Sequence, residues 1–231
     1  MTGLIVLALC LSSAGAEPRK ALIYDIGKTK DAPRFVQETE ITDTAAGEKL
    51  WVSKINDAQG VLVMTERAIL KYGKITYQYV EQLQIAEAYE LKVDGGKATF
   101  QTFSLAYGKK GPPVQTKTVA VGTEFMTGPM TEIFLQKQWA ELSQGKSIRV
   151  EFGIFELSKA VDFKFKKISD KPEVMEIEMR PANFFISLLV EPIRIEFNKE
   201  SKRMVHFKGR TPLREQSNGR WTAIDAEIIY P

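Results

Sequence analysis

Hydrophobic and polar side chains alternate along most of the chain, which is the pattern of β-strands that bury one face and expose the other. The alternation is regular over residues 35–42 in the first half and over residues 148–154, 161–166 and 175–180 in the second. Short turns such as Asp94-Gly95-Gly96, and a loop expected over residues 109–113, separate these segments. We count ten or eleven of them, and their spacing predicts a mainly β (α+β) protein with one large antiparallel sheet.

One segment, residues 129–143, departs from this alternation and predicts the one long helix of the chain. Pro129 suits the first turn of a helix, and Gly145 suits the position just past its end. Leu135 and Trp139 follow helical spacing. Because large sheets curl, we expect a large curved antiparallel sheet, or an open half-barrel, wrapped around this helix. The helix either packs as ordinary core or lies beside an enclosed cavity, and the sequence leaves both open.

The composition favours a single domain. The 231 residues are 44% hydrophobic and 26% charged, and no change in composition and no internal repeat divides them. We therefore assign residues 17–231 to one β-rich domain. The formal net charge is +3, with basic and acidic residues interspersed. Nucleic-acid binding calls for a clustered basic face, so we expect no nucleic-acid partner.

The first 16 residues predict a secretory signal peptide. They carry no charge, contain an apolar run over residues 4–11, and end in small residues that suit cleavage after Ala16. The run is shorter than the ~20 residues that cross a bilayer, which argues against a membrane anchor. Cys10 raises the alternative of a lipoprotein, but Leu9 stands where a small residue is expected. We expect a periplasmic protein with no membrane span and no cysteine after cleavage.

Residues for metal or nucleophilic chemistry are scarce. His206 is the single histidine, and its neighbours Val205 and Phe207 point to the other side of a predicted strand. Without a second histidine or a cysteine in the mature chain, zinc sites and histidine-based nucleophiles lack their usual parts. No Asp-x-Asp-x-Asp loop suggests calcium. We expect no metal, no cofactor and no enzymatic activity.

Carboxylates offer one weak exception. The pairs Glu38 and Glu40, and Glu176 and Glu178, are each two residues apart on a strand and are best explained as solvated faces. Glu87 falls in phase with apolar neighbours in the segment 83–93, so it is a candidate for a buried carboxyl with a shifted pKa. A place at a strand end, or beside a basic neighbour, is the more ordinary explanation.

The segment 184–209 carries a resemblance. An apolar run over residues 184–190 is followed by a hairpin with a turn at Asn198, and Pro192 lies between them. The run favours a short buried helix. The matching positions are Leu189, Val190, Pro192, Ile193, Ile195, Phe197, Asn198, Ser201, Arg203, Val205, Phe207 and Gly209. They resemble the closing portion of a group of exported bacterial β-rich proteins of unknown function. In architecture alone, the chain is also similar to the half-barrels of periplasmic lipoprotein carriers.

These features lead to a hydrophobic ligand as the first hypothesis. A non-enzymatic envelope protein would bury the acyl chain of a lipid, or of a lipoprotein, between the concave sheet and the helix, at ~0.8 kcal/mol per CH₂ group. The candidate lining residues are Leu135, Trp139, Phe184, Phe185, Leu188 and Glu87. As an alternative, the run 184–190 is plain core.

The rival hypothesis is an envelope interaction protein. It would have a fully packed interior, bind no small molecule, and use exposed strand edges to join an assembly. An enzyme comes third, because only Glu87 supports it. We expect a monomer under each hypothesis.

Overall fold

The computed structural model describes residues 18–231 except 45–46, 107 and 184–190. In the first half the strands are β1 (Arg19–Asp25), β2 (Phe35–Asp43), β3 (Glu48–Asp57), β4 (Leu62–Lys71), β5 (Lys74–Gln82), β6 (Glu87–Asp94), β7 (Lys97–Ala106) and β8 (Lys109–Ala120). In the second half they are β9 (Phe125–Met126), β10 (Ile148–Ile154), β11 (Lys159–Asp170), β12 (Val174–Pro181), β13 (Ile193–Asn198), β14 (Met204–Ser217) and β15 (Arg220–Ile229). The helical segments are η1 (Leu83–Ile85), η2 (Gly128–Met130), α1 (Thr131–Lys137) and α2 (Trp139–Ser143).

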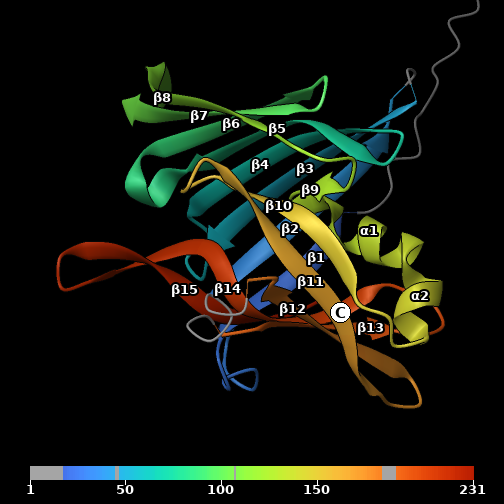
Figure 1. Cartoon of the computed structure of the whole chain (residues 1–231). Helices are drawn as coiled ribbons and strands as arrows, with labels where there is room; N and C mark the ends of the chain where they lie inside the picture. Colours follow the sequence, from blue (N-terminus) through green and yellow to red (C-terminus); the bar gives the residue numbers. More distant parts are fainter. Residues whose placement is uncertain (1–17, 45–46, 107, 184–190) are drawn as a thin grey trace, which may run out of the picture.

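All of these strands belong to one curved sheet that does not close (Figure 1). Its order is β8-β7-β6-β5-β4-β3-β2-β1-β15-β14-β13-β12-β11-β10-β9, so β1 and β15 pair at its centre and β8 and β9 are its two ends. Neighbouring strands are antiparallel, except that β9 runs parallel to β10. The predicted mainly β fold with a large curved sheet is confirmed, with more strands than the pattern suggested.

Alternation places apolar side chains inside the curve and charged ones outside. Between β11 and β12, Phe165 lies opposite Met179 and both are buried, whereas the next pair, Lys164 and Arg180, faces outward. The inward side chains form two cores. The first core joins β4–β7 with β9–β13 and the helices, and the second joins β1–β6 with β14 and β15. The interior of the curve is therefore filled by side chains from both halves of the chain.

The β9 end of the sheet is tucked inside the curve. Phe125 and Met126 are buried in the first core, where β9 contacts β5. Gly153 of β10 makes this fit possible, because a Cβ atom there would lie 2.9 Å from the Phe125 ring. The sheet thus has one buried end and one exposed end.

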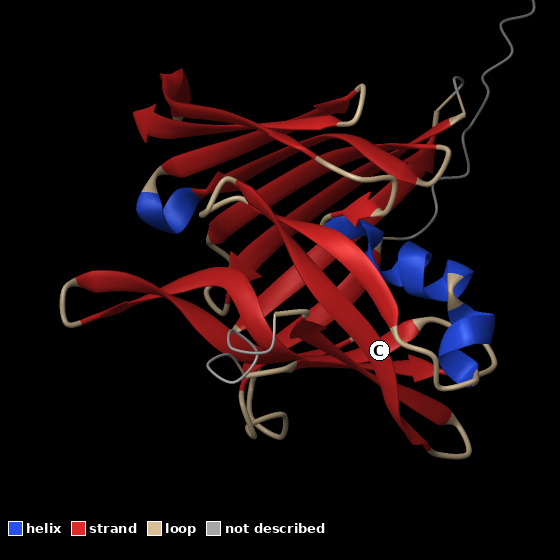
Figure 2. Ribbon diagram, in the orientation of Figure 1, coloured by secondary structure: helices blue, strands red, loops and turns tan. Residues whose placement is uncertain are grey.

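The helix expected over residues 129–143 is not continuous. It is divided into η2, α1 and α2, and Gln138 forms a turn between α1 and α2. Leu135 and Leu142 are seven residues apart, which is about two helical turns, and both enter the first core. The helices lie at one margin of the curve rather than on its axis (Figure 2). In the described part of the chain, no helix has the length and apolar character needed to span a membrane.

The helical margin is fixed to the centre of the sheet by Arg19. Its guanidinium donates to the carboxylate of Glu132 in α1 and to the carbonyl of Met204, and it stacks 4.4 Å from the ring centre of Tyr230. At the opposite margin, the Gln84 side chain donates to the Arg214 carbonyl at 2.6 Å and accepts from its N–H at 2.9 Å. The Gln84 contacts link η1, which lies between β5 and β6, to β14, which is far from them in strand order.

Two strand predictions are corrected. Residues 109–113 were expected to form a loop because they contain glycine and two prolines, but they belong to β8, a strand at the edge of the sheet. Proline is tolerated there because the edge does not use every N–H group. The segment 83–93 was expected to be one strand, but it begins with η1, and Ala86 has a left-handed backbone (φ 53°) before β6 starts at Glu87.

Candidate functional site

The structure brings two of the predicted ligand residues together. Leu135 is fully buried (0% exposed) in the first core. Trp139 is half-buried and packs edge-on against Phe197, with ring centres 5.9 Å apart. The Lys202 ammonium lies 6.0 Å from the Trp139 ring centre. The other apolar residues of the predicted site, Phe184, Phe185 and Leu188, lie outside the described residues.

Glu87 lies elsewhere. It is the first residue of β6, just after η1, and η1 is at the margin of the sheet opposite to α1 and α2 (Figure 2). Its carboxylate accepts a hydrogen bond from the Tyr89 hydroxyl at 2.5 Å. Burial, together with this carboxylate, raises the pKa of Tyr89. Glu87 therefore occupies the strand end that the sequence offered as its ordinary explanation.

A different carboxyl, that of Glu66, faces the interior of the curved sheet. Glu66 of β4 accepts a hydrogen bond of 2.6 Å from the Gln78 amide, and Ser53 lies opposite it on β3. Burial raises the pKa of Glu66 to about 7, although the Gln78 hydrogen bond acts in the other direction. Among the described residues, no cation pairs with Glu66, and the buried Gln78 oxygen has no partner. This group was missed by the sequence analysis.

Two hollows mark the outer face of the sheet. The first has a volume of about 270 Å³ and crosses β12–β15, and the second has a volume of about 210 Å³ and crosses β11 and β12, with Ser147 just before β10 at its side. Polar and charged side chains line both of them. In the sequence, the charged positions of these strands indicate solvated faces, and neither hollow is evident from their pattern.

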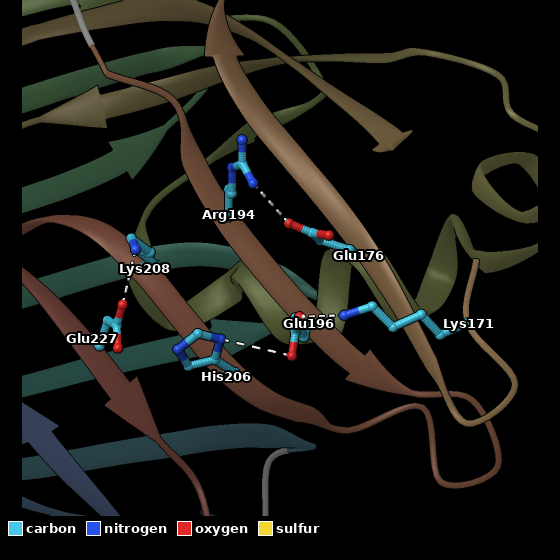
Figure 3. A pocket seen from close by; sticks show the side chains of 7 residues that line it. All are labelled: Lys171, Glu176, Arg194, Glu196, His206, Lys208 and Glu227. Carbon is cyan, nitrogen blue, oxygen red and sulfur yellow. Dashed lines mark hydrogen bonds and ion pairs between the residues drawn. The ribbon is translucent and has the colours of Figure 1, made fainter. Parts of the chain in front are cut away.

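The first hollow is lined by Lys171, Glu176, Arg194, Glu196, His206, Lys208 and Glu227 (Figure 3). Side chains of unlike charge reach one another across it. Arg194 lies opposite Lys208 but reaches Glu176 at 3.5 Å, and Lys208 lies opposite Glu227, which it meets at 2.9 Å. Three basic residues and three carboxylates therefore balance when His206 is neutral.

The remaining contacts of the first hollow also join side chains of unlike charge. Glu196 lies 3.5 Å from the Lys171 ammonium and 3.7 Å from the His206 Nδ1 atom. Burial alone would raise the pKa of Glu227, but the hydrogen bond and charge of Lys208 bring it below its ordinary value. The charged side chains of the first hollow thus pair with one another, and the hollow presents no net charge to a ligand.

The second hollow is lined by Ser147, Lys164, Lys166, Glu178, Arg180, Pro181 and Ala182. Its charges do not balance, because it holds three basic residues and one carboxylate. Arg180 donates to Glu178 through Nε at 2.5 Å and through Nη2 at 3.0 Å. Among the described residues, Lys164 and Lys166 take part in no ion pair. In the same part of the chain, no cluster of histidine, cysteine and carboxylate residues suits a metal ion.

Comparison with known proteins gives one structural similarity. No protein-family model and no curated protein matches the chain. A crystal structure of a β-barrel-like protein of the domain of unknown function DUF1849, from Brucella abortus, aligns with 94% of this chain and 96% of its own. The sequence identity is 8% and the TM-score is 0.41. The resemblance that residues 184–209 carry stays a prediction.

Proposed function

We propose that this chain is an exported, non-enzymatic envelope protein that works by binding an extended segment of another protein at strand β8. The difference between the two ends of its sheet carries the proposal. β9 is short and buried, whereas β8 spans 12 residues, most of them exposed, and among the described strands it pairs only with β7. An unpaired strand edge offers backbone groups to a partner strand.

The register of β8 identifies which of its backbone N–H and C=O groups face the free edge. Val121, just after the strand, donates its N–H to the Gly96 carbonyl at 2.9 Å. Because hydrogen-bonded and non-hydrogen-bonded pairs alternate in an antiparallel ladder, the backbone groups of Thr116, Thr118 and Ala120 face the free edge. Further back, Pro112 and Pro113 lack N–H groups. The docking segment is therefore residues 114–120.

The charge of β8 favours an acidic partner segment over a second copy of the chain. The strand contains three lysines and no acidic residue. Lys110 is held by Glu90 at 2.5 Å, and among the described residues Lys109 and Lys117 take part in no ion pair. Val114 is 65% exposed beside them and adds apolar contact area. Two copies of β8 would bring like charges together.

The test uses Thr118→Pro and its matched control Thr118→Ala. Both remove the hydroxyl that contacts Thr99 at 3.0 Å, but only proline removes the outward N–H. With a photo-reactive residue at Val114, we expect a discrete protein adduct from native envelope extract that the alanine variant keeps and the proline variant loses. The same adduct with both variants, or none with the parent, would contradict docking at this edge. Adduct formation only between copies of this chain would replace the acidic partner by a dimer.

A hydrophobic ligand remains the second candidate function. The half-buried Trp139, beside the fully buried Leu135, favours it because the indole keeps some surface for an acyl chain. Native mass spectrometry of the freshly purified chain would then show co-purifying lipid. A dye-labelled fatty acid would also quench Trp139, and a Trp139→Phe variant would lose that signal. A clean mass and unchanged fluorescence would argue against a carrier.

A further inference from the structure

Three basic residues stand side by side on the outer face of β10, β11 and β12. Arg149 lies opposite Lys164, and Lys164 lies opposite Arg180. Residues directly opposite each other in a sheet have Cβ atoms about 4.5–5.5 Å apart, and like charges in that arrangement repel. This basic row is therefore unfavourable unless another group neutralises it.

Neighbouring carboxylates neutralise the row only in part. Glu178 is committed to Arg180. Glu151 of β10 accepts the Gly122 N–H at 2.6 Å, and its neighbour Asp162 is not among the residues that line the second hollow. Lys166 adds a further cation on the same face. The second hollow keeps a net charge of +2, from three basic residues and one carboxylate.

We infer that the second hollow binds an anionic group, a phosphate or a carboxylate, carried on a small organic skeleton. Lysine ammonium groups act as point charges toward phosphate, and a guanidinium has donors beyond the two that Arg180 gives to Glu178. The Ser147 hydroxyl adds a neutral donor, and Pro181 and Ala182 offer an apolar wall to the skeleton. The ligand is either a free phosphorylated or carboxylated molecule or the headgroup of an anionic lipid.

This inference goes beyond the proposed docking at β8. The second hollow lies on β11 and β12, whereas the docking edge lies at the other end of the sheet. The Thr118→Pro variant should therefore bind an anion as the parent does.

The experiment compares the full chain with a Lys164→Ala, Lys166→Ala double variant. Its matched control is a Lys171→Ala, Lys208→Ala double variant, which removes two lysines from the first hollow. Glycerol 3-phosphate is titrated at low salt, and binding is followed by NMR shifts of the residues around Ser147. We expect the second-hollow variant to lose roughly threefold to tenfold in affinity per lysine, and the control to lose less than twofold.

Vesicles distinguish the two sources of the anion. Phosphatidylcholine vesicles with and without phosphatidylglycerol are mixed with the same variants and sedimented. Binding of glycerol 3-phosphate alone supports a free ligand, whereas added binding to the anionic vesicles, lost in the second-hollow variant, supports a lipid headgroup. The inference is overturned if the parent binds neither probe, or if both double variants weaken binding equally. Equal weakening would mean that net charge alone attracts the anion.

Discussion

The two hollows of the outer face differ in how their charged side chains are balanced. They share β12, which gives Glu176 to the first and Glu178 to the second. In the first, three carboxylates and three basic residues form ion pairs, whereas the second holds three basic residues and one carboxylate, and its Lys164 and Arg180 stand in one row with Arg149. The balance of charges therefore decides whether a charged face is self-sufficient or requires a counter-charge from outside.

The largest effect should come from a carboxyl that pairs with no cation among the described residues. Glu66 has only the Gln78 amide, and its raised pKa means that the folded state favours the neutral acid. The contribution of Glu66 to stability should be greatest below pH 4.5, fall as the pH rises toward about 7, and change little above it. Glu66→Gln should remove this decline and stabilise the fold by about 2 kcal/mol at pH 8, because partial solvent access reduces the full shift.

Urea unfolding of the parent and the Glu66→Gln variant between pH 4 and pH 9 would measure this difference. Glutamine preserves the size of the side chain and its contact with the Gln78 amide, so the two curves should coincide at low pH. A parent whose stability is as flat across this range as that of the variant would contradict a buried neutral acid at this position.

The balance of the first hollow can be broken by Lys208→Met. Glu227, whose side chain is 10% exposed, would lose its partner at 2.9 Å and remain as an uncompensated carboxylate. We expect a loss of about 1–2 kcal/mol at pH 7. The pKa of Glu227 is lowered in the parent, so the contribution of the pair is present above the ordinary pKa and is lost as the pH falls through the lowered one.

The matched variant for this measurement is Lys166→Met in the second hollow. It removes one positive charge from a hollow that has more basic residues than carboxylates. Its free energy of unfolding should therefore stay within about 0.5 kcal/mol of the parent value. Equal losses for the two variants at pH 7 would show that the balance of charges in each hollow does not matter.

The smallest effect should come from reversing one charge in the basic row. Lys164→Glu would place an acidic side chain between Arg149 and Arg180. We expect a gain of about 0.5 kcal/mol in the free energy of unfolding together with loss of glycerol phosphate binding. Lys164→Ala separates the two contributions, because it relieves repulsion without adding an acid. A loss of stability in Lys164→Glu would mean that the row is already neutralised within the chain.

Much of the fold follows from the sequence, because alternation is a local property. The segments 148–154 and 175–180 show their buried and exposed faces directly, and both became strands with those faces. Edge strand β8 was missed over residues 109–113, because Pro112 and Pro113 are read as loop residues unless the strand is known to lie at an edge. The bend at Gln138 was missed because it depends on what the helix packs against.

The candidate sites were harder to predict from the sequence than the fold. That Lys164 and Lys166 share a face is evident from their spacing, but their alignment with Arg149 and Arg180 depends on pairing between strands, which one sequence does not specify. The pairing of Glu176 with Arg194 was hidden for the same reason. Glu87 was selected by its phase with apolar neighbours, and that phase was lost when the chain formed η1 before β6.

The tucked β9 end has a consequence for self-association. Gly153 lets Phe125 lie close to β10, and Phe125 and Met126 of β9 are buried, so among the described strands this margin is covered by the core. Growth into a fibre requires each molecule to have two open sheet edges, so that it can pair with one neighbour at each edge. A molecule with only β8 open stops growth after a single addition, so even crowded copies would end as pairs and would not build filaments.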